Sequence, residues 1–160
     1  MSVPALSQLV LGVLLVGWIA SRQLAWRPLD PRRSWTMPIV LAGAGLVVLA
    51  SSAPAAVRPV DLGFLALELA VSVAIGAVMG AIAVFRDADR GLETRTGWLG
   101  LVLWIVLIAA RVGLGFWGAA AGAELAESAG VILLVVGVNR VVRLLVVLGR
   151  ARRRLEAVAA

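Results

Sequence analysis

The sequence predicts an all-α integral membrane bundle of five transmembrane helices, forming a single domain over residues 1–160. Of the 160 residues, 62% are hydrophobic and only 15% are charged, and the mean hydropathy is +1.02. Soluble domains carry only about 45–50% apolar residues. The charges gather in short intervals between long uncharged runs, as expected for helices solvated by lipid. The expected spans are approximately 3–20, 35–52, 62–85, 97–118 and 128–148, and a basic cytoplasmic tail follows at 149–160.

The first two predicted spans are short, but each is long enough to be a candidate for crossing the bilayer. The run from Val3 to Ala20 would form a helix of about 27 Å, close to the ~30 Å of the hydrocarbon core. No basic residue precedes this run, which favours an uncleaved anchor over a signal peptide. The second run begins at Trp35, and its Pro38 lies near the first turn, where a helix tolerates proline. A tilted or partly inserted hairpin remains an alternative for this second span.

The last three spans are long enough to cross a bilayer, and their connections are brief. The polar loop from Arg86 to Thr96 joins the third and fourth spans, and Gly91 predicts a turn within it. A small connection rich in Ala and Gly joins the fourth and fifth spans. No loop is long enough for a soluble domain.

The distribution of arginine predicts the orientation of the bundle. All fifteen basic residues are Arg, and loops rich in basic residues are retained on the cytoplasmic side. One side of the predicted bundle carries only Arg58. The other side carries Arg22, Arg27, Arg32, Arg33, Arg86, Arg90, Arg95, Arg150, Arg152, Arg153 and Arg154. We therefore expect the N-terminus outside and the C-terminus in the cytoplasm.

The composition excludes several kinds of chemistry. The chain contains no Cys, no His and no Tyr, so it lacks thiol chemistry, the commonest general base and the commonest neutral metal ligand. It also lacks a phosphate-binding loop, a dinucleotide-binding glycine motif, HExxH and GxSxG. We predict no catalytic residues, no metal and no cofactor. The net charge of +6 is explained by membrane orientation, and nucleic-acid binding is not expected.

Four polar residues inside the predicted spans need an explanation, because a charge at the centre of a span costs about 2.5–3.5 kcal/mol. Glu68 and Arg111 both lie roughly 10 Å below the outer surface, so neighbouring antiparallel helices could pair them. This pair would form a functional buried polar site or a structural ion pair, or both side chains would extend outward to the interface. Asn139 and Arg140 lie near the middle of the fifth span. Arg140 would meet Glu68, line a water-filled crevice, or belong to a helix displaced toward the cytoplasm.

A set of small residues follows Glu68 at intervals of four, which places them on one helix face. The set consists of Ser72, Gly76 and Gly80, and its two glycines form a GxxxG motif. Small residues allow two helices to approach closely in lipid. We expect this face to pack within the chain, and homodimerisation is the alternative.

The order of several residues resembles a known family. They are Gly76, Gly80, Arg86, Gly91, Trp104 and Arg111, together with the run Arg27-Pro28-Leu29. In these features the chain is similar to the CcdC-like family of small polytopic bacterial membrane proteins, a domain of unknown function. The resemblance implies a multi-helix inner-membrane protein. In some bacteria, members of the family are named for an association with cytochrome c maturation. This chain has no Cys or His for haem or thiol chemistry. The resemblance therefore implies an accessory role at most.

These observations lead to two functional hypotheses. The first is a noncatalytic multi-pass protein of the bacterial inner membrane, an accessory or scaffold component that packs with membrane partners or copies of itself. The second is a permease or transporter subunit in which Glu68, Arg111 and Arg140 form a polar site. The lipid bilayer is the surrounding partner in both, and the basic tail offers a surface for anionic lipid.

Overall fold

A computed structural model describes residues 21, 24–30, 34–52, 57–88, 91–123, 125 and 128–159. The first predicted span, 3–20, lies outside the described residues, as do Arg22, Arg32, Arg33 and Arg90. The statements below concern the described part of the chain.

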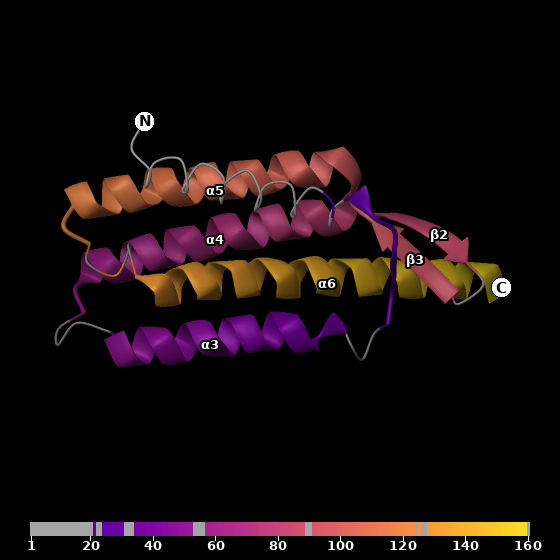
Figure 1. Ribbon diagram of the computed structural model, residues 1–160, viewed down its shortest axis with the longest axis horizontal. Coiled ribbons are helices and arrows are strands. Elements are labelled where there is room, and N and C mark those ends of the chain that lie inside the picture. Colours follow the sequence, from indigo (N-terminus) through magenta and orange to yellow (C-terminus); the bar gives the residue numbers. More distant parts are fainter. Residues whose placement is uncertain are drawn as a thin grey trace, which may run out of the picture.

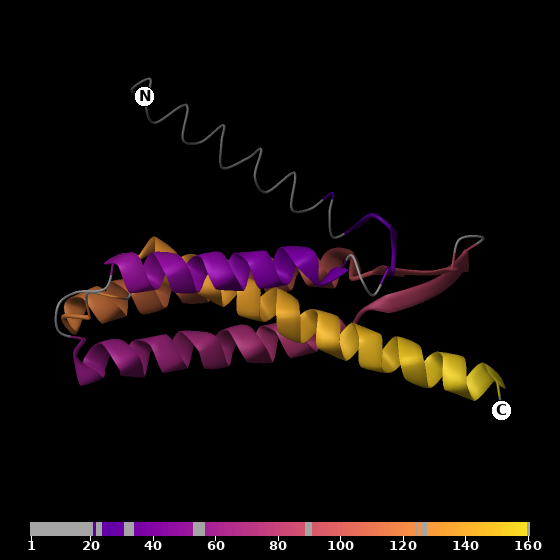
Figure 2. The same ribbon diagram turned by 90° about the horizontal axis from the view of Figure 1, so that it is seen from below.

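Four helices run side by side in the bundle (Figure 1). They are α3 (Thr36–Ser52), α4 (Pro59–Ala81), α5 (Gly97–Ala120) and α6 (Ala129–Ala159). Helix α6 packs against both α3 and α4, and α5 packs against α4. Figure 2 shows that the C-terminal part of α6 extends beyond the other helices, on the side where the strands lie.

Three of these helices, α4, α5 and α6, are long and apolar enough to cross a membrane, whereas α3 is shorter, with 17 residues. Large apolar side chains cover the outside of the bundle, and Phe116 on α5 is 75% exposed. Such a surface is suited to lipid, since water-soluble monomers rarely expose large apolar patches. The prediction of a mainly helical chain is thus confirmed, and three of its helices are long and apolar enough to span a membrane. The number of five spans and the orientation stay predictions.

The apolar centre of the bundle lies where α4, α5 and α6 meet. Its buried side chains are Ile75, Met79, Trp104, Leu107, Val131 and Val135. Each helix contributes two of these residues, so this cluster holds the three long helices at fixed positions relative to one another.

Helices α3 and α6 approach each other through glycines. A Cβ atom placed on Gly137 would lie 2.5 Å from the Ala42 backbone nitrogen, and one placed on Gly45 would lie 2.5 Å from the Leu134 nitrogen. Gly130 likewise contacts the backbone of α3. In lipid, where no hydrophobic force drives helices together, such close backbone contact supplies the packing energy. The sequence analysis did not identify this interface.

The all-α prediction is wrong in one region, because the chain forms a three-stranded sheet at one end of the bundle. The strands are β1 (Arg27–Pro28), β2 (Val84–Ala88) and β3 (Gly91–Arg95), antiparallel and in the order β1-β3-β2. The predicted third span, 62–85, therefore ends too late, since α4 stops at Ala81. The segment predicted as a polar loop is mostly a β-hairpin.

Cross-strand pairing explains why this charged segment forms strands. Arg86 faces Glu93 across β2 and β3, with 2.6 Å between Nη2 and Oε2, and opposite charges at facing positions stabilise a sheet. Gly91 has a φ of +109°, which glycine adopts without strain at the start of β3. Pro28 lies in the edge strand β1, where proline is tolerated.

Helix α6 continues beyond the predicted span end at 148 and through the predicted tail. The Arg150 guanidinium donates hydrogen bonds to two carbonyl oxygens at the end of α4, those of Gly80 (3.0 Å) and Ala83 (2.7 Å). Arg154 forms an ion pair of 2.9 Å with Asp87 on β2. These contacts fasten the tail to the end of α4 and to the hairpin.

Candidate functional site

Glu68 on α4 and Arg111 on α5 form the ion pair expected from their depths. Arg111 Nη1 lies 2.9 Å from Glu68 Oε1. The side chain of Glu68 is completely buried, and that of Arg111 is 15% exposed. Among the residues that the structure describes, Glu68 Oε2 has no hydrogen-bond partner. The carboxylate therefore depends on one strong contact, and that contact joins two helices.

The face formed by Ser72, Gly76 and Gly80 contacts α6. Ser72 Oγ donates a hydrogen bond of 2.6 Å to the Val135 carbonyl, and Asn139 Nδ2 donates one of 3.1 Å to the Ser72 carbonyl. A Cβ atom on Gly76 would lie 2.7 Å from the Asn139 carbonyl oxygen, and the space beside Gly80 is equally restricted. This face is used for packing inside the chain, as expected, and Asn139 serves the α4–α6 contact.

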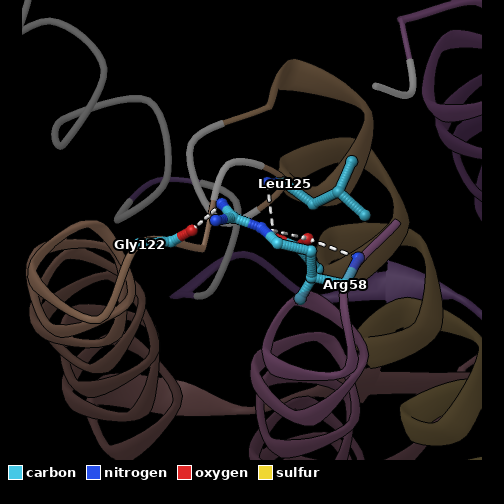
Figure 3. A network of polar contacts seen from close by, with 4 residues as sticks. Arg58, Gly122 and Leu125 are labelled. Atoms are coloured by element: carbon cyan, nitrogen blue, oxygen red, sulfur yellow. Dashed lines mark hydrogen bonds and ion pairs between the residues drawn. The ribbon is translucent and has the colours of Figure 1, made fainter. Parts of the chain in front are cut away.

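Asp61 is a buried acidic residue that the sequence analysis missed. Its Oδ2 accepts a hydrogen bond of 3.0 Å from the Arg58 backbone N–H, and its Oδ1 accepts one of 3.2 Å from the Leu125 N–H. The Arg58 side chain donates to the Gly122 carbonyl, so the start of α4 is tied to the α5–α6 connection (Figure 3). The signal in the sequence is Asp61 in the first turn after Pro59, which marks a helix start.

Arg140 lies at a different level of the bundle from the Glu68–Arg111 pair. Its guanidinium carbon is 4.9 Å from the centre of the Trp104 ring, within the range of a cation–π contact. On α5, Trp104 precedes Arg111 by two helical turns, or about 10 Å. Of the explanations considered for Arg140, the crevice describes its surroundings best, because Arg140 lines a cavity.

This cavity has a volume of about 330 Å³ and lies between the start of α3, the middle of α6 and strands β1 and β3. Three arginines line it, and the rest of the described lining consists of hydroxyl, proline and aliphatic side chains. The described residues that line it are Arg27, Pro28, Leu29, Ser34, Met37, Pro38, Thr94, Arg140, Arg143, Leu144 and Val147. Arg143 also donates a hydrogen bond to Thr96 Oγ1. The structure thus separates two polar features, a largely buried ion pair and a basic cavity.

The described part of the chain brings no three Asp or Glu side chains close enough together to hold a metal ion. Four of the buried polar residues, Glu68, Asp61, Ser72 and Asn139, contact other parts of the same chain, and their bonds connect helices or cap a helix end. The arrangement is suited to holding a bundle together.

Comparison with known proteins gives no further assignment: no family model, no curated protein and no solved structure matches this chain.

Proposed function

We propose that the chain is a noncatalytic accessory or scaffold protein of the bacterial inner membrane. The observation that carries this proposal is the use of the polar side chains inside the bundle. Glu68 binds Arg111, and Ser72 and Asn139 exchange hydrogen bonds between α4 and α6. Each of these contacts joins two helices, so each contributes to the shape of the bundle.

The permease hypothesis receives less support from the geometry. A transport path requires polar groups that share a space open to water, yet the Trp104 ring that Arg140 contacts lies about two turns from Arg111 along α5. Neither Glu68 nor Arg111 lines the 330 Å³ cavity. This spacing favours the accessory role over a single polar site shared by the three charges.

The proposed topology has five spans, with the N-terminus outside and the C-terminus in the cytoplasm. The hairpin and the extended part of α6 lie together at one end of the bundle (Figure 1) and carry Arg86, Arg95 and Arg150, while Arg58 lies at the other end. This asymmetry supports a cytoplasmic location for the sheet end.

The similarity to the CcdC-like family fits this proposal. Of the residues that carry it, Gly76 and Gly80 lie in the α4–α6 contact, Trp104 belongs to the apolar centre, and Arg111 pairs with Glu68. These are roles in building a bundle. We infer an accessory role in the membrane and no direct part in haem or thiol chemistry.

The absence of cysteine makes single-cysteine labelling a direct test. Ser72→Cys places a thiol in the sealed α4–α6 contact, Ser51→Cys places one at the expected outer end of α3, and Leu155→Cys places one on the expected cytoplasmic end of α6. With a membrane-impermeant maleimide on spheroplasts, we expect labelling of Ser51→Cys only. Leu155→Cys should label after lysis, and Ser72→Cys should stay unlabelled in both states.

Labelling of Ser72→Cys in folded protein would indicate a water-filled path and favour the permease. Labelling of Leu155→Cys in intact spheroplasts would contradict the orientation. The accessory role itself is tested by a photoreactive residue at Phe116, with a matched control at Leu107, which is only 3% exposed on the same helix. A discrete protein adduct from position 116 alone is expected, and lipid adducts alone at that position would contradict the role.

A further inference from the structure

The region where α5 and α6 meet has a half-exposed apolar surface. The two helices touch through Trp104 on α5 and Arg140 on α6, whose ring centre and guanidinium carbon are 4.9 Å apart. From this contact an apolar stripe continues along each helix at intervals of four residues, which keeps it on one helix face. The side chains of three of its four members are between 42% and 52% exposed. We call these residues the open face: Ile108 and Val112 on α5, and Ile132 and Val136 on α6.

The chain that precedes the sheet is fixed close to the start of α5. Trp26 is held on the hairpin by two guanidinium groups, because the Arg86 and Arg95 carbons lie 4.5 Å and 4.6 Å from its ring centre. Arg95 ends β3, and α5 begins shortly after it at Gly97. The predicted span 3–20 ends six residues before Trp26, and six residues reach at most about 20 Å. A span over these residues therefore enters the membrane beside the start of α5.

Strand β1 places this entry on the side of α5 that carries the open face. Pro28 of β1 lines the same cavity as Arg140, and Arg140 is the residue at which the open face begins on α6. A helix that ends just before β1 and runs along the bundle from there passes over Ile108 and Val112. Residues 3–20 would form about 27 Å of helix, which is long enough to cover both.

The guanidinium of Arg111 lies at the edge of the open face. A Cβ atom placed on Gly115 would be 3.2 Å from Arg111 Nη1. Gly115 follows Trp104 by three helical turns, so it lies on the same side of α5 as Ile108. The side chain of Arg111 is 15% exposed, about 21 Å along α5 from Gly97. A charge this deep in a membrane is costly unless polar groups contact it.

The predicted span 3–20 carries a polar side chain at a matching depth. Gln8 precedes Ala20 by twelve residues, or about 18 Å of helix. A guanidinium has five N–H donors, so Arg111 can donate to the Gln8 amide oxygen while it is bonded to Glu68. Glutamine side chains form such hydrogen bonds between helices in membranes. Docking therefore gives the amide a partner that lipid tails cannot provide.

We infer that the predicted span 3–20 docks on the open face as a helix antiparallel to α5, with Gln8 beside Arg111. The inference rests on the proposed topology, in which this span crosses the membrane. It goes beyond that topology by naming α5 and α6 as the neighbours of the span, and it does not depend on the accessory role.

The test is disulfide formation in the full chain, which has no natural cysteine. Ile108→Cys supplies the thiol on the open face. It is combined in turn with four replacements that together cover one full turn of the span at the depth of Ile108. These are Gln8→Cys, Leu9→Cys, Val10→Cys and Leu11→Cys.

The matched control is Val106→Cys, combined with the same four replacements. Val106 is 46% exposed and Ile108 is 42% exposed, but Val106 lies about half a turn away around α5, on the flank where Trp117 contacts Phe64. Both thiols lie in one tryptic peptide, 96–111, and the span lies in peptide 1–22. Mass spectrometry of the linked peptides therefore compares the two positions directly.

Mild oxidation in native membranes should give about fivefold or more linked peptide with Ile108→Cys than with Val106→Cys, because a disulfide requires Cα atoms within about 7 Å. Equal yields, or no link from Ile108→Cys to any of the four positions, would overturn the inference. A disulfide-linked dimer of the Ile108→Cys single variant, in place of the link within the chain, would also overturn it and identify a second copy as the occupant.

A separate label distinguishes failure of docking from failure of the topology. Ser2→Cys should react with a membrane-impermeant maleimide in intact spheroplasts, because the N-terminus is expected outside. Absence of this reaction would contradict the crossing of span 3–20, and the docking with it. Reaction of Ser2→Cys without any link to Ile108→Cys would refute the docking alone.

Discussion

Removing the positive charge of Arg111 should strongly destabilise the bundle. Arg111→Gln leaves the completely buried side chain of Glu68 without its cation. Breaking a buried ion pair in this way costs about 3–5 kcal/mol. The carboxyl can also take up a proton, and for an ordinary Glu at pH 7 this costs about 4 kcal/mol, which limits the loss. We therefore expect a decrease of about 3–4 kcal/mol in the free energy of unfolding.

The reverse deletion should cost less. In Glu68→Gln the amide oxygen can still accept a hydrogen bond, and the Arg111 side chain, 15% exposed, can extend toward the interface. We expect a loss of about 1–2 kcal/mol, within the usual range for removing one partner of a hydrogen bond. The double variant should be about 1–2 kcal/mol more stable than the sum of the two losses predicts, because the residues are in direct contact.

The assay is a titration with sodium dodecyl sulfate in mixed micelles, followed by circular dichroism. The control is the exposed pair Arg152 and Glu156, separated by 2.8 Å on α6, where the same substitutions should change stability by less than about 0.5 kcal/mol. Strictly additive losses at Glu68 and Arg111 would show that the contact is energetically unimportant and would refute the reasoning.

Three further predictions follow from the helix contacts. Gly137→Ala should lower the unfolding free energy by about 1–3 kcal/mol, since its Cβ would lie 2.5 Å from the Ala42 nitrogen, whereas Gly149→Ala, with nothing within 4 Å, should be neutral or stabilising in the same titration. Asp61→Ala should cost about 1–2 kcal/mol, because two backbone N–H groups lose their acceptor, and hydrogen exchange should increase at residue 125; unchanged protection there would contradict this role. Arg150→Gln should loosen the end of α4, measured as faster exchange at residues 80–85, and equal exchange in both proteins would show that the two carbonyl contacts do not hold it.

Much of the helical architecture could be predicted because long runs of apolar residues identify membrane helices from the local sequence alone. The predicted span 35–52 agrees closely with α3, and the start of the fourth span at Gly97 coincides with the start of α5. The end of α4 could not be predicted in the same way. The apolar run continues through Ala83 to Phe85, and a short apolar run does not distinguish helix from strand.

The errors share a physical origin in contacts between distant residues. The carbonyls of Gly80, near the end of α4, and of Ala83, just after it, accept hydrogen bonds from Arg150, about seventy residues later in the chain. The hairpin depends on the Arg86–Glu93 pair and on an edge strand from residues 27–28. Local hydropathy does not predict any of these long-range contacts. The segment therefore resembled a charged loop.

In the candidate site, too, some features could be predicted from the sequence and others depended on contacts between distant residues. The Glu68–Arg111 pair could be expected because helix rise converts sequence position into depth, and equal depths on adjacent helices bring side chains together. Depth alone does not say which way a side chain points around its helix. Arg140 therefore remained ambiguous until the position of Trp104 beside it was known.

The glycine contact between α3 and α6 has a consequence for how the protein is made. Helix α3 leaves the ribosome early, yet the helix against which its backbone lies begins only at Ala129. At translation speeds of about 5–20 residues per second, α3 waits several seconds for that neighbour. During this interval lipid, or a chaperone in the membrane, must cover its exposed backbone. Docking of α3 onto α6 therefore requires synthesis at least as far as Gly137.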